Sequence, residues 1–179
     1  PAEAVRRHFD RELAARGFRA DPAQQRAIAQ LADWLGAQLA PKRRWRRPAA
    51  GFYLWGGVGR GKSFVMDCLF AAAPVVNKRR VHVHGFLQEL QQRLNAYSGQ
   101  PEPLARVAAD LAGEARLLCF DEFHVHDIGD AILLGRLLEC LLREGVALVF
   151  TSNFAPAGLC PNPLYHVLFR PFITLLQRH

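Results

Sequence analysis

One glycine-rich segment constrains the fold of this chain more than any other feature. Residues 56–63 read GGVGRGKS, directly after an apolar run at residues 52–55 and at the start of a helix-forming run over residues 61–70. The segment matches GxxxxGK[ST], a pattern that requires a strand before it and a helix after it. It therefore predicts a strand–loop–helix unit of an α/β fold.

The chemistry of this segment indicates a phosphate-binding loop. Glycines let the backbone curl so that successive N–H groups point inward, and the N-terminus of the following helix adds its positive dipole end. We expect Lys62 to contact the β- and γ-phosphates of ATP and Ser63 to ligate Mg²⁺. The alternative is a glycine-rich turn without a ligand. The residues of the predicted loop are Gly56, Gly57, Val58, Gly59, Arg60, Gly61, Lys62 and Ser63.

The rest of the chain alternates between strand-like and helix-like runs. The alternation favours a P-loop NTPase fold, a three-layer α/β sandwich with a parallel sheet and a ligand site at the carboxyl ends of the strands. Apolar runs predict strands at residues 52–55, 81–84, 117–120 and 146–151. Helical spacing predicts helices at residues 61–70, 86–95, 104–111 and 128–142.

Two further helices are expected before this core. Apolar residues recur at helical spacing from Val5 to Leu13. A second helix is expected to begin after Asp21, with Gln24 completing a capping box. Its apolar stripe is wide enough to pack against the core.

Size and charge together suggest one domain with one basic segment. The 179 residues are 50% hydrophobic, which suffices for one buried core. Five of the positive charges behind the net +7 lie in residues 42–47, KRRWRR. We interpret this run as a solvated linker; the alternative is a patch that contacts nucleic-acid phosphates. We therefore expect N-terminal helices that pack on the core at residues 1–40, a basic linker at 41–50 and a P-loop ATPase core at 51–179.

The cysteines and the first residues indicate a reducing, cytoplasmic setting. Cys68, Cys119, Cys140 and Cys160 show neither close pairing nor a CxxC motif, so neither a disulfide framework nor a zinc ribbon is supported. The opening stretch is charged and amphipathic, unlike a signal peptide, and no apolar run approaches membrane-spanning length.

Acidic and amide side chains follow two of the predicted strands. Asp121 and Glu122 come directly after residues 117–120, and Asn153 follows residues 146–151. We expect Asp121 to hold Mg²⁺ through its water shell and Glu122 to polarise the attacking water. Asn153 is expected to orient that water or to contact the γ-phosphate. The alternatives are an acidic turn and a turn-forming asparagine.

Four histidines raise the alternative of a metal site. His82 and His84 alternate on a predicted strand, and His124 and His126 follow the acidic pair. We do not favour this alternative, because no third or fourth ligand is evident and a strand histidine is usually only hydrogen-bonded. Asp127 is expected to cap the helix at residues 128–142.

The motifs together resemble one known family. GVGRGKS, RVHVHGFLQEL, LLCFDEFHVHDIGDAILLGRLLECL and LVFTSNFAPAGLCPNPLYH, from about residue 21 onward, resemble the ZapE family of bacterial cell-division ATPases, related to the mitochondrial AFG-like ATPases. The resemblance implies an AAA+ type fold, Mg²⁺-dependent ATP hydrolysis, homo-oligomeric rings and a protein partner, the tubulin-like division-ring protein. It makes Lys62 and Ser63 the Walker A pair, Asp121 and Glu122 the Walker B pair, and Asn153 the sensor.

The chain departs from the family pattern in two places. His124 and His126 stand where many members have Gln and Thr, and Leu168 stands where many relatives have an arginine three residues before a proline. An arginine acting in trans on a neighbour's ATP contributes ~10³–10⁵ in rate. Arg170 is the candidate for that role, and the alternatives are that Arg178 serves or that neither arginine does. We also expect the core to be truncated, without the C-terminal lid of an AAA+ protein.

Two other function classes stay open. An ATP-switched nucleic-acid module such as a helicase loader fits the P-loop and the basic run, and it is the alternative to an ATPase that remodels a protein. A small-molecule kinase also fits the P-loop. It explains the acidic pair less well, since kinases seldom need a water-directing glutamate.

Overall fold

The computed structural model describes residues 2–17, 19–39, 51–59 and 61–155. From β1 onward, one or two helices separate each strand from the next, as the sequence predicts. In chain order the elements are α1 (Ala2–Ala15), α2 (Pro22–Leu39), β1 (Gly51–Trp55), α3 (Lys62–Ala72), β2 (Lys78–His82), α4 (Val83–Ala96), α5 (Pro103–Glu114), β3 (Leu117–Asp121), α6 (Ile128–Arg143) and β4 (Ala147–Ser152).

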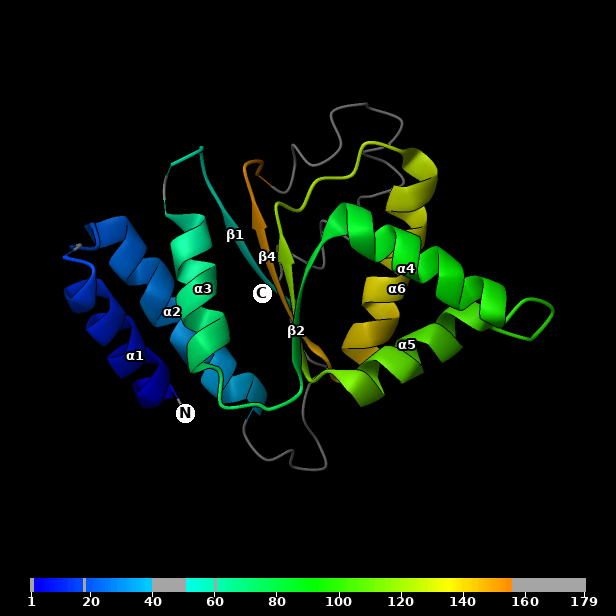
Figure 1. The fold of residues 1–179 in the computed structure, drawn as a ribbon, viewed down its shortest axis with the longest axis horizontal. Coiled ribbons are helices and arrows are strands. Elements are labelled where there is room, and N and C mark those ends of the chain that lie inside the picture. Colours follow the sequence, from blue (N-terminus) through cyan, green and yellow to red (C-terminus); the bar gives the residue numbers. More distant parts are fainter. Residues whose placement is uncertain (1, 18, 40–50, 60, 156–179) are drawn as a thin grey trace.

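The strands form one parallel sheet between two helical layers. Their order is β1-β4-β3-β2, and each adjacent pair is parallel. In Figure 1 helices α1, α2 and α3 cover one face of the sheet, and α4, α5 and α6 cover the other. This arrangement confirms the predicted three-layer α/β fold with N-terminal helices.

Alternate residues of the central strands face opposite layers. Leu118 and Phe120 of β3 pack with the layer of α4, α5 and α6, whereas Leu117 and Cys119 pack with the layer of α1, α2 and α3. Every residue of β3 and β4 is buried. Because both faces are covered, these strands appear in the sequence as continuous apolar runs.

Four phenylalanines pack beneath the carboxyl ends of these two strands. The rings of Phe120 and Phe150 are stacked with centroids 5.3 Å apart, and Phe123 meets both edge-on at 5.9 and 4.9 Å. Phe86 of α4 meets Phe120 edge-on at 5.0 Å. Such pairs add to the stabilisation from burial, so the cluster anchors the segment after β3 on a rigid base.

The predicted helix caps are present. The Gln24 N–H donates to Asp21 Oδ1 at 2.8 Å, and the Asp21 N–H donates to Gln24 Oε1 at 3.1 Å, which completes the capping box of α2. The Asp130 N–H donates to Asp127 Oδ1 at 3.0 Å at the start of α6.

The second strand is where the structure differs most from the prediction. Lys78–His82 forms β2, not residues 81–84, and α4 begins directly after it. His82 and His84 therefore lie on different elements, and the prediction that they alternate on one strand was wrong. The basic residues 78–80 are half-buried at this sheet edge, and their charge concealed the strand because the prediction relied on apolar runs.

Some predicted features lie outside the described residues. They are the basic linker at 41–50, Arg60, Cys160, Arg170 and Arg178. Within the described part, Cys68, Cys119 and Cys140 carry free thiols. Among the described helices, none combines the length and apolar character needed to cross a membrane.

Candidate active site

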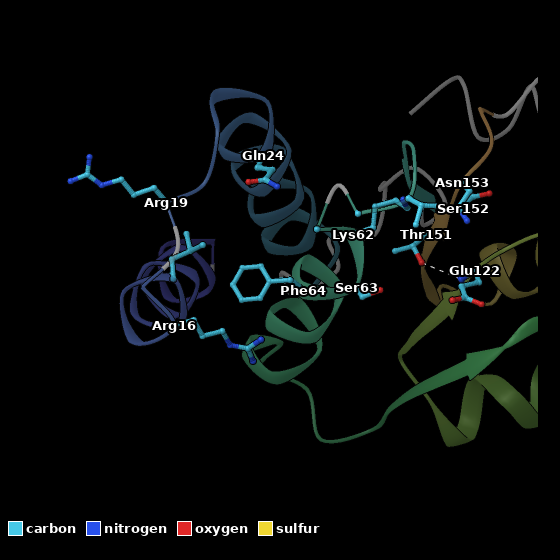
Figure 2. Close-up of a pocket in the computed structure, with 14 residues that line it drawn as sticks. Arg16, Arg19, Gln24, Lys62, Ser63, Phe64, Glu122, Thr151, Ser152 and Asn153 are labelled. Carbon is cyan, nitrogen blue, oxygen red and sulfur yellow. Dashed lines mark hydrogen bonds between the residues drawn. The ribbon is translucent and has the colours of Figure 1, made fainter.

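The carboxyl ends of β1, β4 and β3 lie side by side, and a cavity of about 570 Å³ opens beside them. Strand β4 lies between β1 and β3, so the residues after these three strands come together although they are far apart in sequence. Figure 2 shows Lys62 pointing toward the end of β4, with Glu122 below it. The lining residues are Leu13, Arg16, Arg19, Gln24, Val58, Gly59, Gly61, Lys62, Ser63, Phe64, Glu122, Thr151, Ser152 and Asn153.

Two glycines of the described part of the loop have a backbone conformation that few other residues adopt. Gly59 and Gly61 have φ of 77° and 79°, a left-handed conformation that favours glycine. The Lys62 ammonium donates to the carbonyl oxygens of Gly56 and Gly57, each at 2.7 Å, so the lysine lies over the loop. Lys62 is the first residue of α3, and the positive end of the helix dipole therefore points at the loop.

Glu122 has an unusual backbone conformation. Its φ is 51°, which is left-handed and costly for a residue with a side chain. Its N–H donates to Thr151 Oγ1 at 3.2 Å, the dashed line in Figure 2. The next N–H, of Phe123, donates to the Thr151 carbonyl at 2.6 Å, and Ser152 Oγ donates to the Phe123 carbonyl at 2.8 Å. These bonds tie the turn after β3 to β4 and place Glu122 at the cavity.

Asp121 is held by Arg80, which was not among the predicted site residues. The Asp121 residue is buried, with an exposed fraction of 7%. Its Oδ2 accepts from Nε of Arg80, and Arg80 Nη1 donates to Oδ1 of Asp67 on α3. Burial alone would lower the pKa of Arg80, but the two carboxylates outweigh that effect and raise it. A smaller cavity of about 300 Å³ beside this pair is lined by Ser63, Arg80, His82, Asp121 and Glu122.

The N-terminal helices form one wall of the larger cavity. Leu13 lies in the last turn of α1, Arg16 directly after this helix, Arg19 in the segment before α2, and Gln24 in α2. Gln24 lies close to the loop, because a Cβ on Gly61 would stand 2.9 Å from its Nε2. These residues were not among the predicted site residues.

Part of this wall packs on the helix that follows the loop. The Arg16 guanidinium lies 4.9 Å from the ring centroid of Phe64 on α3, a cation–π contact. The pairing depends on how α1 packs against α3, which the apolar periodicity of α1 does not reveal.

Two of the histidines form a pair beside the site. His124 Nδ1 and His126 Nε2 lie 2.9 Å apart, and the His124 ring stacks on Phe154 with centroids 4.4 Å apart. Burial lowers the pKa of His124, and the neighbouring His126 adds to that effect. Within the described part of the chain, no group of three or more His, Cys, Asp or Glu side chains could hold a metal ion.

The chain has a glycine-rich loop after β1, an acidic pair at the end of β3, and polar residues at the end of β4, which lies between these two strands. This combination is typical of the class of P-loop NTPases. Residues 3–179 match the AFG1-like ATPase family, a family of ATP hydrolases, and the chain belongs to it.

Two relatives illustrate the family. The chain is 43% identical over 132 residues to the cell division protein ZapE of Escherichia coli strain K12, which covers 74% of this chain and 35% of ZapE. It is 36% identical over 143 residues to the lactation elevated protein 1 homolog B of Danio rerio, which covers 74% of this chain and 28% of that protein. The chain thus spans about a third of the length of these relatives.

Solved structures share the fold at low identity. DnaI superposes with a TM-score of 0.60 at 19% identity, covering 88% of this chain and 81% of DnaI. DnaA of Aquifex aeolicus bound to AMPPCP superposes with a TM-score of 0.57 at 15% identity, covering 86% of this chain and 46% of DnaA. These similarities establish an AAA+ type fold and carry no information on substrate.

Proposed function

We propose that this chain binds ATP with Mg²⁺ and hydrolyses it at the cavity beside β1, β3 and β4. The observation that carries the proposal is that Lys62, Ser63, Glu122 and Asn153, which come from three separate segments, line the same cavity. Cationic, hydroxyl, carboxylate and amide groups at one place are the set that phosphoryl transfer to water requires.

The phosphates fit the loop at residues 56–63. Backbone N–H groups of such a loop and the start of α3 would attract the negative oxygens, and the Lys62 ammonium would exchange its bonds to the loop carbonyls for bonds to the β- and γ-phosphates. Glu122 accepts a proton from the attacking water, and Asn153 orients that water by hydrogen bonding. The nucleoside lies toward the wall formed by Leu13, Phe64 and the N-terminal helices.

The oxygen groups of the smaller cavity fit a magnesium ion. The Ser63 hydroxyl and the Asp121 carboxylate line it together, and Mg²⁺ prefers oxygen ligands while keeping several waters. Bound Mg²⁺ would neutralise charge on the β- and γ-phosphate oxygens. Ser63 would ligate the ion directly, and Asp121 would hold it through its water shell.

The proposal also covers the oligomeric state of the protein and its protein partner. Family membership supports homo-oligomeric rings in the cytoplasm, in which Arg170 or Arg178 acts on a neighbour's ATP, and action on the tubulin-like division-ring protein. Residues 1–40 would pack on the core, 41–50 would link and 51–179 would form the ATPase. A shift of native mass toward a closed oligomer on addition of AMPPNP is expected; a monomer at every concentration would contradict the ring.

The test of nucleotide binding is a comparison of Lys62→Ala with the wild-type full chain. We expect Lys62→Ala to weaken ATP affinity in calorimetry and to abolish phosphate release. The control is Arg143→Ala, which removes a cation of the exposed Arg143–Glu139 pair on α6 and should leave both unchanged. Equal, near-zero phosphate release by the wild type and Lys62→Ala would contradict the proposal.

A further inference from the structure

Arg80 connects three elements around the candidate magnesium site. It stands on β2 and forms ion pairs with Asp121 at the end of β3 and with Asp67 on α3. Asp67 lies four residues after Ser63, one turn further along α3. One guanidinium therefore ties the helix that carries Ser63 to the strand that carries Asp121.

The contact fixes the carboxylate of Asp121. Arg80 Nε donates a hydrogen bond to Oδ2 of Asp121, and the Thr151 hydroxyl lies 3.5 Å from Oδ1. The Asp121 side chain is only 9% exposed, and Arg80 is 27% exposed. Each carboxylate oxygen thus has a fixed partner, which holds Asp121 in one orientation, and the guanidinium compensates the buried charge.

We propose that Arg80 is a positioning residue for Mg²⁺ binding: it sets the orientation of Asp121 and, through Asp67, the spacing between Asp121 and Ser63. The planar guanidinium fork can engage two carboxylates at once with fixed geometry. This inference rests on the proposed function, because it assumes that Ser63 and Asp121 hold the ion.

Two other roles for Arg80 make different predictions. If the arginine only stabilises the fold, its loss changes nucleotide affinity equally with and without Mg²⁺. If its charge mainly repels the incoming cation, its loss increases the benefit of Mg²⁺. A positioning role predicts that the benefit of Mg²⁺ falls while affinity without metal stays the same.

The experiment measures AMPPNP affinity of the full chain by calorimetry, once with excess Mg²⁺ and once with EDTA. The ratio of the two affinities is the Mg²⁺ gain. Residues that orient metal ligands typically contribute about 10–100-fold to metal affinity, so we expect Arg80→Gln to lower the gain by about tenfold. We expect no change with EDTA.

Two further variants keep the test informative if Arg80→Gln folds poorly. Arg80→Lys retains the charge but lacks the fork, so it should recover only part of the gain. Asp67→Asn leaves Arg80 on Asp121 but removes its anchor on α3. It should lower the gain less than Arg80→Gln and in the same direction.

The neighbouring Arg79 supplies the matched control. It lies on the same strand with a similar exposed fraction of 29%, and it pairs with Glu89 and Glu114 away from the cavity. Arg79→Gln should keep the wild-type gain.

The outcomes separate the two proposals. An unchanged or increased gain in Arg80→Gln, or an equal loss with and without Mg²⁺, would overturn the positioning role while the proposed function stands. A wild type with no Mg²⁺ gain would overturn the magnesium proposal itself and this inference with it.

Discussion

The strained backbone at Glu122 leads to a quantitative prediction. A left-handed conformation at a residue with a side chain lowers the free energy of unfolding by roughly 1–2 kcal/mol. Glycine avoids this cost, but its greater freedom in the unfolded chain lowers the free energy of unfolding by roughly 0.5–1 kcal/mol relative to alanine. With φ at 51°, Glu122→Gly should be more stable than Glu122→Ala by about 0.5–1 kcal/mol. At helical or strand positions the usual order is the reverse.

The assay is thermal and urea unfolding of the two variants. The expected difference corresponds to about 1–4 °C in Tm. Glu102 supplies the control, because its φ of 50° is nearly the same and it lies at the start of α5. There too Gly should exceed Ala in stability, but only the Glu122 variants should lose phosphate release. A Glu122→Gly variant no more stable than Glu122→Ala would refute the reasoning.

Three shorter predictions follow from the packing and the pKa shifts. Gly61→Ala should weaken nucleotide binding in calorimetry, because φ is 79° and the new Cβ would stand 2.9 Å from Gln24 Nε2. Phe150→Ala should cost about 3–5 kcal/mol of unfolding free energy in urea titrations, since the buried ring stacks on Phe120. Burial raises the pKa of Cys119 from 9.0 to about 12. The unfolded thiol ionises first, so the stability it contributes is complete below about pH 9 and declines as the pH rises toward 12. Unfolding free energy should fall more between pH 8 and pH 10.5 in the wild type than in Cys119→Ala.

Local patterns in the sequence predicted much of the fold and several of the residues that line the candidate site. The loop at residues 56–63 and the helix cap at Asp127 are determined by residues adjacent in sequence, so the local sequence is enough to predict them. Strands β3 and β4 were recognised because burial on both faces makes them continuously apolar. Strand β2 was misplaced because a half-buried edge strand can begin with basic residues.

The pairing of distant residues could not be predicted in the same way. Arg80 meets Asp121 because β2 and β3 pair in a register that places His82 opposite Asp121. Arg16 reaches the cavity because α1 packs against α3. Both contacts follow from the register and packing of distant elements, which leave no signal in either segment alone.

The central claim is that Glu122 acts on water while the loop holds the nucleotide. The most direct measurement is single-turnover hydrolysis of ATP by the full chain and by Glu122→Gln, with ATP affinity measured in parallel. General bases contribute about 10²–10⁴-fold, so we predict that Glu122→Gln binds ATP like the wild type and hydrolyses it at least a hundredfold more slowly. Equal hydrolysis rates in the two proteins would contradict the account.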